Sequence, residues 1–533
     1  MRGPSFVVFP KMSCMEETSN ASRSCTPLPS EWKPTQWDIS EANQVPDREN
    51  IQCFKVALLQ SQDAQDCKPL LPATDDPLPG IGYLQSRQDM PTGQATYPLS
   101  LLSDLVNASG WDDVLERLKC SFSETFKRHV YLNELDLFSF SRKGIRHPTP
   151  LVYAQACMSS LVSRNASSFI HDDYSSSPLA ESVNLFVLGV KLWIVTVEMD
   201  NRESRNDEML LASSLLATYG LLSANPTIWD ASRALLAYGT TILKRLQMSP
   251  KLGSCLSSPR SLHISYTFMV DVLSAAHFQT LPSLSTTELF LELPSSGYQF
   301  QQVYRQLLNS YEPLPSNIHS REDILLLLVA LLCDIIYIQR NDLAHRMRSK
   351  DPPINPFTPL SRSRERERQQ KLLSGALDCW HRHFGDNADQ NILALFFFCK
   401  LVLSCPILPL LSCIAGYAVF PGSGLPSQDM VLASGSDQVS VSGDPVNYAW
   451  KVLDHVDVSQ RSLDSQLPIW LPITLFSSAL VVWQNLRAHS SSSRQYGSLK
   501  VLRTFIHELN QLPWGCCQVM SSVLQRLSVE AST

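Results

Sequence analysis

The residues that could bind a metal ion are the cysteines and histidines. The chain has 14 cysteines and 12 histidines in 533 residues. Zinc sites use closely spaced cysteine pairs, often followed by a closely spaced histidine pair. The first four cysteines, Cys14, Cys25, Cys53 and Cys67, are too widely spaced for such a site, and no such histidine pair follows them. We therefore expect no metal site and no cofactor, and we interpret the cysteines as buried thiols of a reducing compartment.

Two histidine groups have the residue types of a catalytic site without a suitable geometry. His381 and His383 lie near Asp386, but positions two apart point to different sides of a helix. His171 precedes two aspartates in a polar, Ser-rich stretch. No Gly-x-Ser-x-Gly, His-Glu-x-x-His or Walker sequence occurs. We expect that the protein is not an enzyme, with a helical enzyme of unfamiliar type as an alternative.

Basic side chains are concentrated between Arg346 and Lys371, where eight basic residues accompany three acidic ones. The whole chain has a formal charge of -6 and a pI near 6.1, which excludes a surface built throughout for nucleic acid. Exposed clusters of Lys and Arg are typical of nuclear-import signals and of phosphate contacts. The candidate import or nucleic-acid contact therefore consists of four residues, Arg362, Arg364, Arg366 and Arg368. The plainer interpretation is a solvated loop and helix start.

The distribution of proline and of apolar residues divides the chain into four regions. Residues 1–99 are rich in proline and have little apolar periodicity, which predicts a mostly irregular, disordered segment. Residues 100–345 and 371–533 have helical patterns, and residues 346–370 separate them as a basic, proline-rich linker. The expected fold is all-α: an antiparallel multi-helix bundle or array with short loops.

Helical spacing is clearest after Pro226, which suits the first turn of a helix. The apolar residues there step by three or four positions: Ile228, Ala231, Leu235, Tyr238, Ile242 and Leu246. The same spacing continues from Leu262 to Ala276. In the last region, the pattern predicts helices near residues 371–384, 389–405, 467–489 and 497–528.

The chain leaves this helical pattern at Pro282. Ser285-x-x-Glu288 has the spacing of a capping box, which predicts one new helical turn. Leu289, Leu291 and Leu293 then alternate as in an extended strip. We expect the strip to lie with its apolar edge in a groove between helices, so that its role is structural.

Two uncharged stretches, residues 401–420 and 467–483, have lengths near that of a bilayer span. Prolines interrupt both stretches, and Ser and Cys dilute their apolar character. We interpret them as buried core helices and expect no membrane partner. A helical membrane-associated protein is the alternative.

Three segments in order carry a resemblance to a known family. They are "HPTPLVYAQACMSSLVS", "LLASSLLATYGLLSANPTIWDASRALLAYGTTILKRL" and "YTFMVDVLSAAHFQTLPSLSTTELFLELP". Together they resemble the fungal-specific transcription factor regulatory domain, the middle homology region of fungal zinc-finger and zinc-cluster regulators. The resemblance covers roughly residues 140–340.

The family pattern matches this chain at individual positions. The opening segment corresponds to His147, Pro148 and Thr149, and the next helix to Leu215, Leu216, Tyr219, Gly220 and Leu221. The clearest signature corresponds to Asp271, Phe278, Pro282, Leu284, Glu288, Leu291, Leu293 and Pro294. The family usually has a Trp a few residues after this proline, where Tyr298 and Phe300 stand here.

The resemblance implies a nuclear regulator of transcription, and the family association suggests a biosynthetic gene cluster for a secondary metabolite. Most members read DNA through a zinc domain placed before the helical region. Neither the zinc-finger pattern nor the zinc-cluster pattern occurs in this sequence. We therefore expect the protein to act through other transcription regulators or co-regulators, with indirect contact to DNA.

Overall fold

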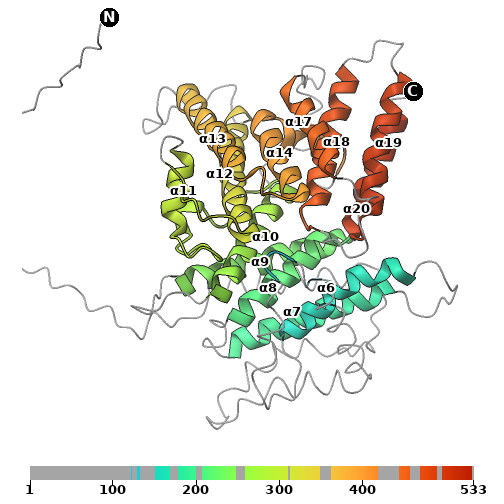
Figure 1. Cartoon of the computed structure of the whole chain (residues 1–533). Coiled ribbons are helices and arrows are strands. Elements are labelled where there is room, and N and C mark those ends of the chain that lie inside the picture. Colours follow the sequence, from blue (N-terminus) through green and yellow to red (C-terminus); the bar gives the residue numbers. More distant parts are fainter. Residues whose placement is uncertain are drawn as a thin grey trace, which may run out of the picture. The chain divides into compact units, whose positions relative to one another are not determined.

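The computed structural model describes residues 150–167, 178–199, 207–247, 258–309, 313–347, 362–417, 443–456, 468–488 and 495–530, with six positions between 122 and 132. Within these ranges the chain forms fourteen α-helices, one short 3-10 helix and no strand (Figure 1). The expected all-α fold is thus confirmed for the described part of the chain. The predicted irregular segment 1–99 and the family's opening residues His147, Pro148 and Thr149 lie outside it.

Five helices make up the first group in the chain. They are α6 (Pro150–Ser167), α7 (Pro178–Met199), α8 (Asp207–Leu222), α9 (Pro226–Gln247) and α10 (Ser258–Phe278). α8 contacts each of the other four helices, and all its residues from Met209 to Leu222 are buried. A helix that is apolar on every side is stable only inside such a group. α9 begins at Pro226, as the sequence predicts.

Small and hydroxylated residues allow α8 to approach its neighbours closely. The hydroxyls of Thr218 and Tyr266 are 2.8 Å apart and link α8 to α10. A Cβ atom on Gly220 would lie 2.3 Å from the Cβ of Ser232 on α9. Glycine at position 220, one of the positions that match the family pattern, therefore sets the distance between α8 and α9.

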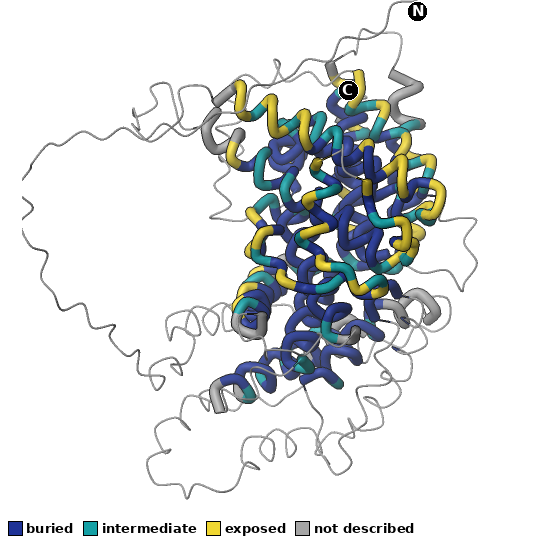
Figure 2. Tube along the Cα trace, turned by 60° about the vertical axis from the view of Figure 1, so that its left-hand side comes forward, coloured by how far each residue is buried: buried dark blue, intermediate teal, exposed yellow. Residues whose placement is uncertain are grey.

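The remaining helices continue the same core. They are α11 (Phe300–Leu308), α12 (Arg321–Met347), α13 (Arg362–Phe384), α14 (Gln390–Ser404), α15 (Leu408–Ile414), α17 (Asp444–His455), α18 (Leu471–Ala488), α19 (Gln495–Gln511) and α20 (Gly515–Glu530). α12 contacts α10, α13 and α14, and its residues from Ile324 to Cys333 are fully buried. Both helical regions of the sequence thus share one apolar core, which runs through the helices in Figure 2.

α12 and α13 run antiparallel. The indole N–H of Trp380, near the end of α13, donates to the carbonyl of Ile324, near the start of α12, at 3.1 Å. α13 begins at Arg362, so residues 362–370 are helical although the sequence pattern assigns them to a linker. Arg, Glu and Gln favour helices, and no proline follows Pro359 in this stretch. Residues 348–361 lie outside the described part.

Two further features of the helices differ from the prediction: one expected helix is divided in two, and one helix is additional. The single pattern over residues 497–528 is two helices, α19 and α20, separated at Pro513, which cannot donate an N–H inside a helix. A Cβ on Gly515 would lie 2.8 Å from the backbone N of Ala224, so α20 starts against the turn between α8 and α9. The helix α17, in a region where we predicted no helix, contacts α14 and α18.

The two long uncharged stretches are largely internal where the structure describes them. Every residue from Leu471 to Gln484 in α18 is buried. α14 and α15 together have the length and composition of a span, but they bend by 90° at the break between them. Among the described helices, no single one is long and apolar enough to cross a bilayer.

Candidate functional site

The four arginines predicted as an import or nucleic-acid contact lie in the first two turns of α13. Arg364 and Arg368 are exposed, and Arg366 is partly buried. The side chain of Arg362 is outside the described set. Arg368 lies 4.0 Å from Glu365 in an exposed pair one turn apart, which is worth little in water. Because α12 and α13 are antiparallel, these turns lie at the end of the pair where α12 finishes.

The two histidines of α13 face different neighbours, as their spacing predicts. The His381 ring stacks on Phe396 with centroids 4.7 Å apart. Nδ1 of His383 lies 2.9 Å from the carbonyl oxygen of Cys379, one turn earlier in the helix. Across the described ranges, no three His, Cys, Asp or Glu side chains could hold a metal ion together. His171 and the four N-terminal cysteines lie outside those ranges.

Eight cysteines in the described part of the chain are buried thiols that form no disulfide bond, in agreement with the predicted burial. Burial raises the pKa of several of them, including Cys399 and Cys405. A raised pKa favours the thiol over the reactive thiolate. Cys399 and Cys405 therefore contribute apolar packing in their thiol form.

A buried histidine marks the junction between the first and the last helices. Burial lowers the pKa of His277 to about 3, so its ring is neutral. Its Nε2 lies 3.1 Å from the hydroxyl of Tyr417, just after α15. Trp229 packs against His277 at 5.6 Å between ring centroids, and Phe476 of α18 packs against Tyr417 at 4.7 Å. This aromatic group joins α9 and α10 to α18 and has no exposed proton acceptor.

Residues 280–299, here called the belt, connect α10 to α11. Inside the belt, Thr286–Glu288 form the one helical turn that the capping-box spacing predicts. Oε2 of Glu288 accepts the backbone N–H of Ser285 at 2.9 Å. Nζ of Lys244 on α9 lies 2.9 Å from Oε1 of Glu288. Burial alone would raise the pKa of the Glu288 carboxyl. The hydrogen bonds from Ser285 and the charge and hydrogen bond of Lys244 lower it by more, so the pKa lies below its usual value.

The leucine strip lies with its apolar edge inside the protein, as predicted. Leu289, Leu291 and Leu293 are 0%, 2% and 1% exposed, whereas Phe290 between them is 62% exposed. Alternating side chains of an extended segment point to opposite faces. Phe300, one of the two aromatics near the family's Trp position, is fully buried. The belt therefore covers the core.

Asp271 of α10 fixes the start of the belt. Its Oδ2 accepts the backbone N–H groups of Ser283 and Leu284 at 2.8 and 2.9 Å. Burial raises the pKa of this carboxyl to about 6, and the two N–H groups oppose the rise. From the other side, the hydroxyl of Tyr337 on α12 donates to the carbonyl of Pro282 at 2.7 Å.

Two carboxylates of α12 fix the rest of the belt. Oδ1 of Asp334 accepts the hydroxyl of Thr286 at 2.9 Å, and its Oδ2 accepts that of Tyr304 at 2.8 Å. Oδ1 and Oδ2 of Asp323 accept the backbone N–H groups of Ser295 and Ser296 at 3.0 and 2.9 Å. Both carboxylates thus accept hydrogen bonds from backbone and hydroxyl groups, which satisfies Asp323 where it is buried and Asp334 where it is partly buried.

An open hollow of about 630 Å³ lies along α11 beside the belt. Its lining consists of Gln299, Gln301, Gln302, Arg305, Gln306 and Asn309. The sequence analysis did not single out these residues. The signal was readable, because Phe300, Val303, Tyr304 and Leu307 have the spacing of one buried helix face and leave the glutamines and Arg305 on the other.

Comparison of the chain with protein-family models, with curated proteins and with solved structures finds no match. The resemblance to the fungal regulatory domain therefore depends on the residues of this chain and on their contacts. The described part offers a belt whose apolar edge is buried, a basic start of α13 and a polar hollow on α11.

Proposed function

We propose that the protein is a fungal-type transcription regulator that acts in the nucleus through contacts with other regulators or co-regulators. In this proposal it is not an enzyme, and its contact with DNA is indirect. The gene set it controls belongs to a biosynthetic cluster for a secondary metabolite. The basic start of α13 serves nuclear import.

The observation that carries the proposal is the belt. The positions that match the family signature cooperate physically: Asp271 accepts the N–H of Leu284, Glu288 caps the turn, and Leu291 and Leu293 are buried. Phe278 packs on Trp229 with ring centroids 5.8 Å apart. These positions lie within one continuous stretch, residues 271–294. Their contacts make this stretch a structural part of the fold, which is the role that the proposal gives it.

The same unit favours a scaffold over a catalyst. Its ionisable side chains Asp271, Asp323 and Asp334 accept hydrogen bonds from the belt and from a neighbouring tyrosine, so they hold the fold together. Binding sites that lie on rigid elements are positioned more precisely than sites on loops. A rigid helical scaffold is therefore suited to binding other proteins.

Two measurements in cells that naturally carry the gene test the proposal. A fluorescent fusion of the full chain is expected to concentrate in nuclei. Deletion of the gene is expected to change the transcript levels of a limited set of genes, and re-expression is expected to restore them. A fusion held in the cytoplasm or at a membrane, or transcripts unchanged by deletion, would contradict the proposal.

A further inference from the structure

Three basic side chains gather around one aromatic ring, that of Phe397 in α14. Nζ of Lys451 on α17 lies 5.0 Å from the ring centroid. The imidazole of His455, one turn later on α17, stacks on the same ring at 5.0 Å between centroids, and that of His381 on α13 lies at 6.4 Å. Lys451 and His381 are exposed, and His455 is partly exposed. These three residues are here called the basic cluster.

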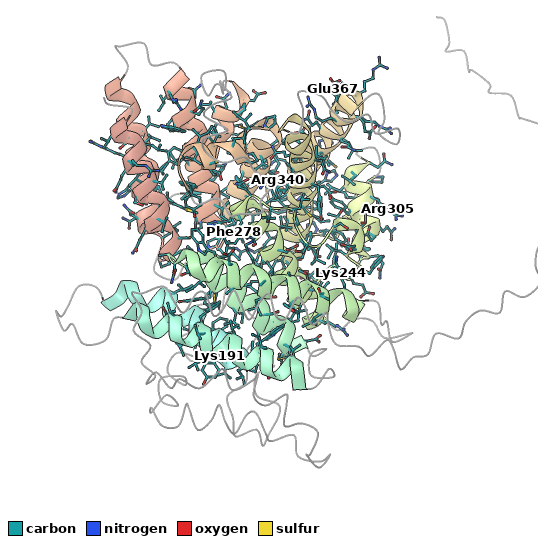
Figure 3. All side chains as sticks on the ribbon, turned by 180° about the vertical axis from the view of Figure 1, so that it is seen from behind. Lys191, Lys244, Phe278, Arg305, Arg340 and Glu367 are labelled. Atoms are coloured by element: carbon teal, nitrogen blue, oxygen red, sulfur yellow. The ribbon has the colours of Figure 1, made fainter. Side chains whose placement is uncertain are left out.

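The basic cluster is separate from the arginines at the start of α13. Figure 3 shows Glu367, which lies in those first turns, at the edge of the protein. An α-helix rises about 1.5 Å per residue, so His381 lies about 21 Å further along the same helix. The cluster is therefore a different surface from the predicted import contact.

Carboxylates near the basic cluster have partners of their own. Oδ1 of Asp378 on α13 accepts Nζ of Lys400 at 2.6 Å. Asp389, which precedes α14, pairs with Arg321. Asp454 is exposed on α17, next to the last residue of that helix. In the described ranges, no carboxylate forms an ion pair with any member of the basic cluster.

The charges around His455 disfavour its protonation. Burial lowers the pKa of its imidazole, Asp454 raises it, and Lys451 and His381 lower it again, so that the pKa lies below its ordinary value. Nδ1 of His455 contacts Oε1 of Gln390, which is an acceptor, so Nδ1 carries the hydrogen and Nε2 is left to take up a proton. A bound anion would offset the neighbouring positive charges and favour that proton.

A phosphate monoester matches the groups of this cluster. At pH 7 it carries a charge of about −1.5 to −2 and presents three strong acceptor oxygens. The ammonium of Lys451 offers three N–H donors, and a protonated imidazole offers two. A carboxylate has less charge and one oxygen fewer, so it would satisfy fewer of these donors. A phosphodiester backbone is bound by many Lys and Arg side chains along its length, whereas the basic cluster is compact and contains one Lys.

We propose that the basic cluster binds a phosphate monoester, with Lys451 and the two imidazoles donating to its oxygens. His455 takes up a proton at Nε2 when the anion binds, so binding is tighter at lower pH. A phosphorylated side chain of a partner protein and free inorganic phosphate supply the same chemistry, and the experiment below distinguishes them. Such a site would operate whether or not the protein regulates transcription.

Fluorescence anisotropy with purified full-length protein tests the site. The probe is a fluorescein-labelled peptide of Gly and Ala with one central phosphoserine, and its counterparts have Ser or Asp at that position. The wild type is expected to bind the phosphopeptide at least tenfold more tightly than either counterpart. Lys451→Gln and His381→Gln are each expected to weaken binding at least threefold without lowering the midpoint of thermal unfolding. Arg382→Gln, an equal charge change at the exposed position next to His381, is expected to leave binding unchanged within about twofold.

The pH dependence and the source of the phosphate are measured with the same probe. Wild-type binding is expected to be at least threefold tighter at pH 6.5 than at pH 8, and the double variant His381→Gln with His455→Gln is expected to lose that difference. Displacement by inorganic phosphate at the dissociation constant of the peptide assigns the site to free phosphate. A need for at least tenfold more phosphate assigns it to a phosphorylated side chain.

Three results would overturn the proposal. The first is equal binding of the three peptides. The second is an equal effect of Lys451→Gln and Arg382→Gln, since the charge would then act without a defined geometry. The third is displacement of the phosphopeptide by a 20-base-pair duplex at an equal phosphate concentration, which would indicate a general affinity for polyanions.

Discussion

Oδ2 of Asp271 accepts the backbone N–H of Leu284 at 2.9 Å, which ties α10 directly to the belt. The same oxygen accepts the N–H of Ser283. One buried carboxylate thus satisfies two backbone donors at the point where the chain leaves the helix. Without it, the buried N–H of Leu284 and the partly buried N–H of Ser283 would lose their acceptor, because the belt has no ladder or helix to bond them there.

Replacement of Asp271 by Ala is expected to lower the free energy of unfolding by about 2–4 kcal/mol, since one buried and one partly buried N–H group lose their acceptor. Denaturant unfolding followed by circular dichroism measures the change. Asp230→Ala, at an exposed position of α9, is the matched control and is expected to change stability by less than about 0.5 kcal/mol. Equal effects of the two variants would show that Asp271 does not hold the belt.

The raised pKa of Asp271 predicts a pH dependence with a definite sign. The carboxyl binds its proton at about pH 6 in the folded state and near its ordinary value when unfolded. Its contribution to stability is therefore fully present below about pH 4 and is lost as the pH rises through 6. Relative to Asp271→Asn, the wild type is expected to lose about 1 kcal/mol between pH 5 and pH 7. A difference between the two proteins that does not vary with pH would contradict this prediction.

The strip offers adjacent positions with opposite environments. Leu291→Asp would place an uncompensated carboxylate in the apolar core and is expected to cost more than about 3 kcal/mol or to prevent folding. Phe290→Asp places the same group in solvent and is expected to cost less than about 1 kcal/mol. Thermal unfolding of both variants compares them directly. Similar midpoints would mean that the strip does not bury Leu291.

The close contact between α8 and α9 predicts how substitutions at Gly220 and Ser232 change the stability of the protein. Gly220→Ala is expected to destabilise the fold by about 1–3 kcal/mol, because the new Cβ would meet the Cβ of Ser232. Ser232→Gly removes that atom. In a double-mutant cycle the two changes are expected to be less damaging together than their sum. Additive effects would place the strain of Gly220→Ala elsewhere.

The basic residues at the start of α13 are expected to direct import of the protein into the nucleus. Combined replacement of Arg362, Arg364, Arg366 and Arg368 by Ala is expected to reduce the ratio of nuclear to cytoplasmic fluorescence of a full-chain fusion at least twofold. Arg364 and Arg368 are exposed, so the fold is expected to persist, and circular dichroism checks that it does. Replacement of Arg382 and Arg503, which are also exposed, is expected to leave the ratio unchanged. The same reduction in both variants would exclude a specific signal.

Local patterns allowed much of the fold to be predicted. Pro226 and the apolar spacing after it located α9, and Ser285, Glu288 and the alternating leucines located the turn and the buried strip, because caps and periodicity act over a few residues. Boundaries were less accurate at Arg362 and Pro513. There, good helix formers extended one helix and a single proline divided another.

The carboxylates that hold the belt could not be predicted from spacing. Asp334 lies 48 residues from the threonine whose hydroxyl it accepts, and Asp323 lies 28 residues from Ser295. Contacts at such separations depend on how α12 lies against the belt, which no local pattern encodes.

The central claim, that this helical chain regulates transcription through protein contacts, is tested most directly by recruitment to a promoter. The full chain is fused to an unrelated DNA-binding domain, and a reporter gene carries that domain's site. The fusion is expected to change reporter output at least fivefold relative to the DNA-binding domain alone. Leu291→Asp is expected to abolish the effect, and Val529→Asp, at an exposed position, is expected to preserve it. Reporter output equal to that of the DNA-binding domain alone would contradict the account.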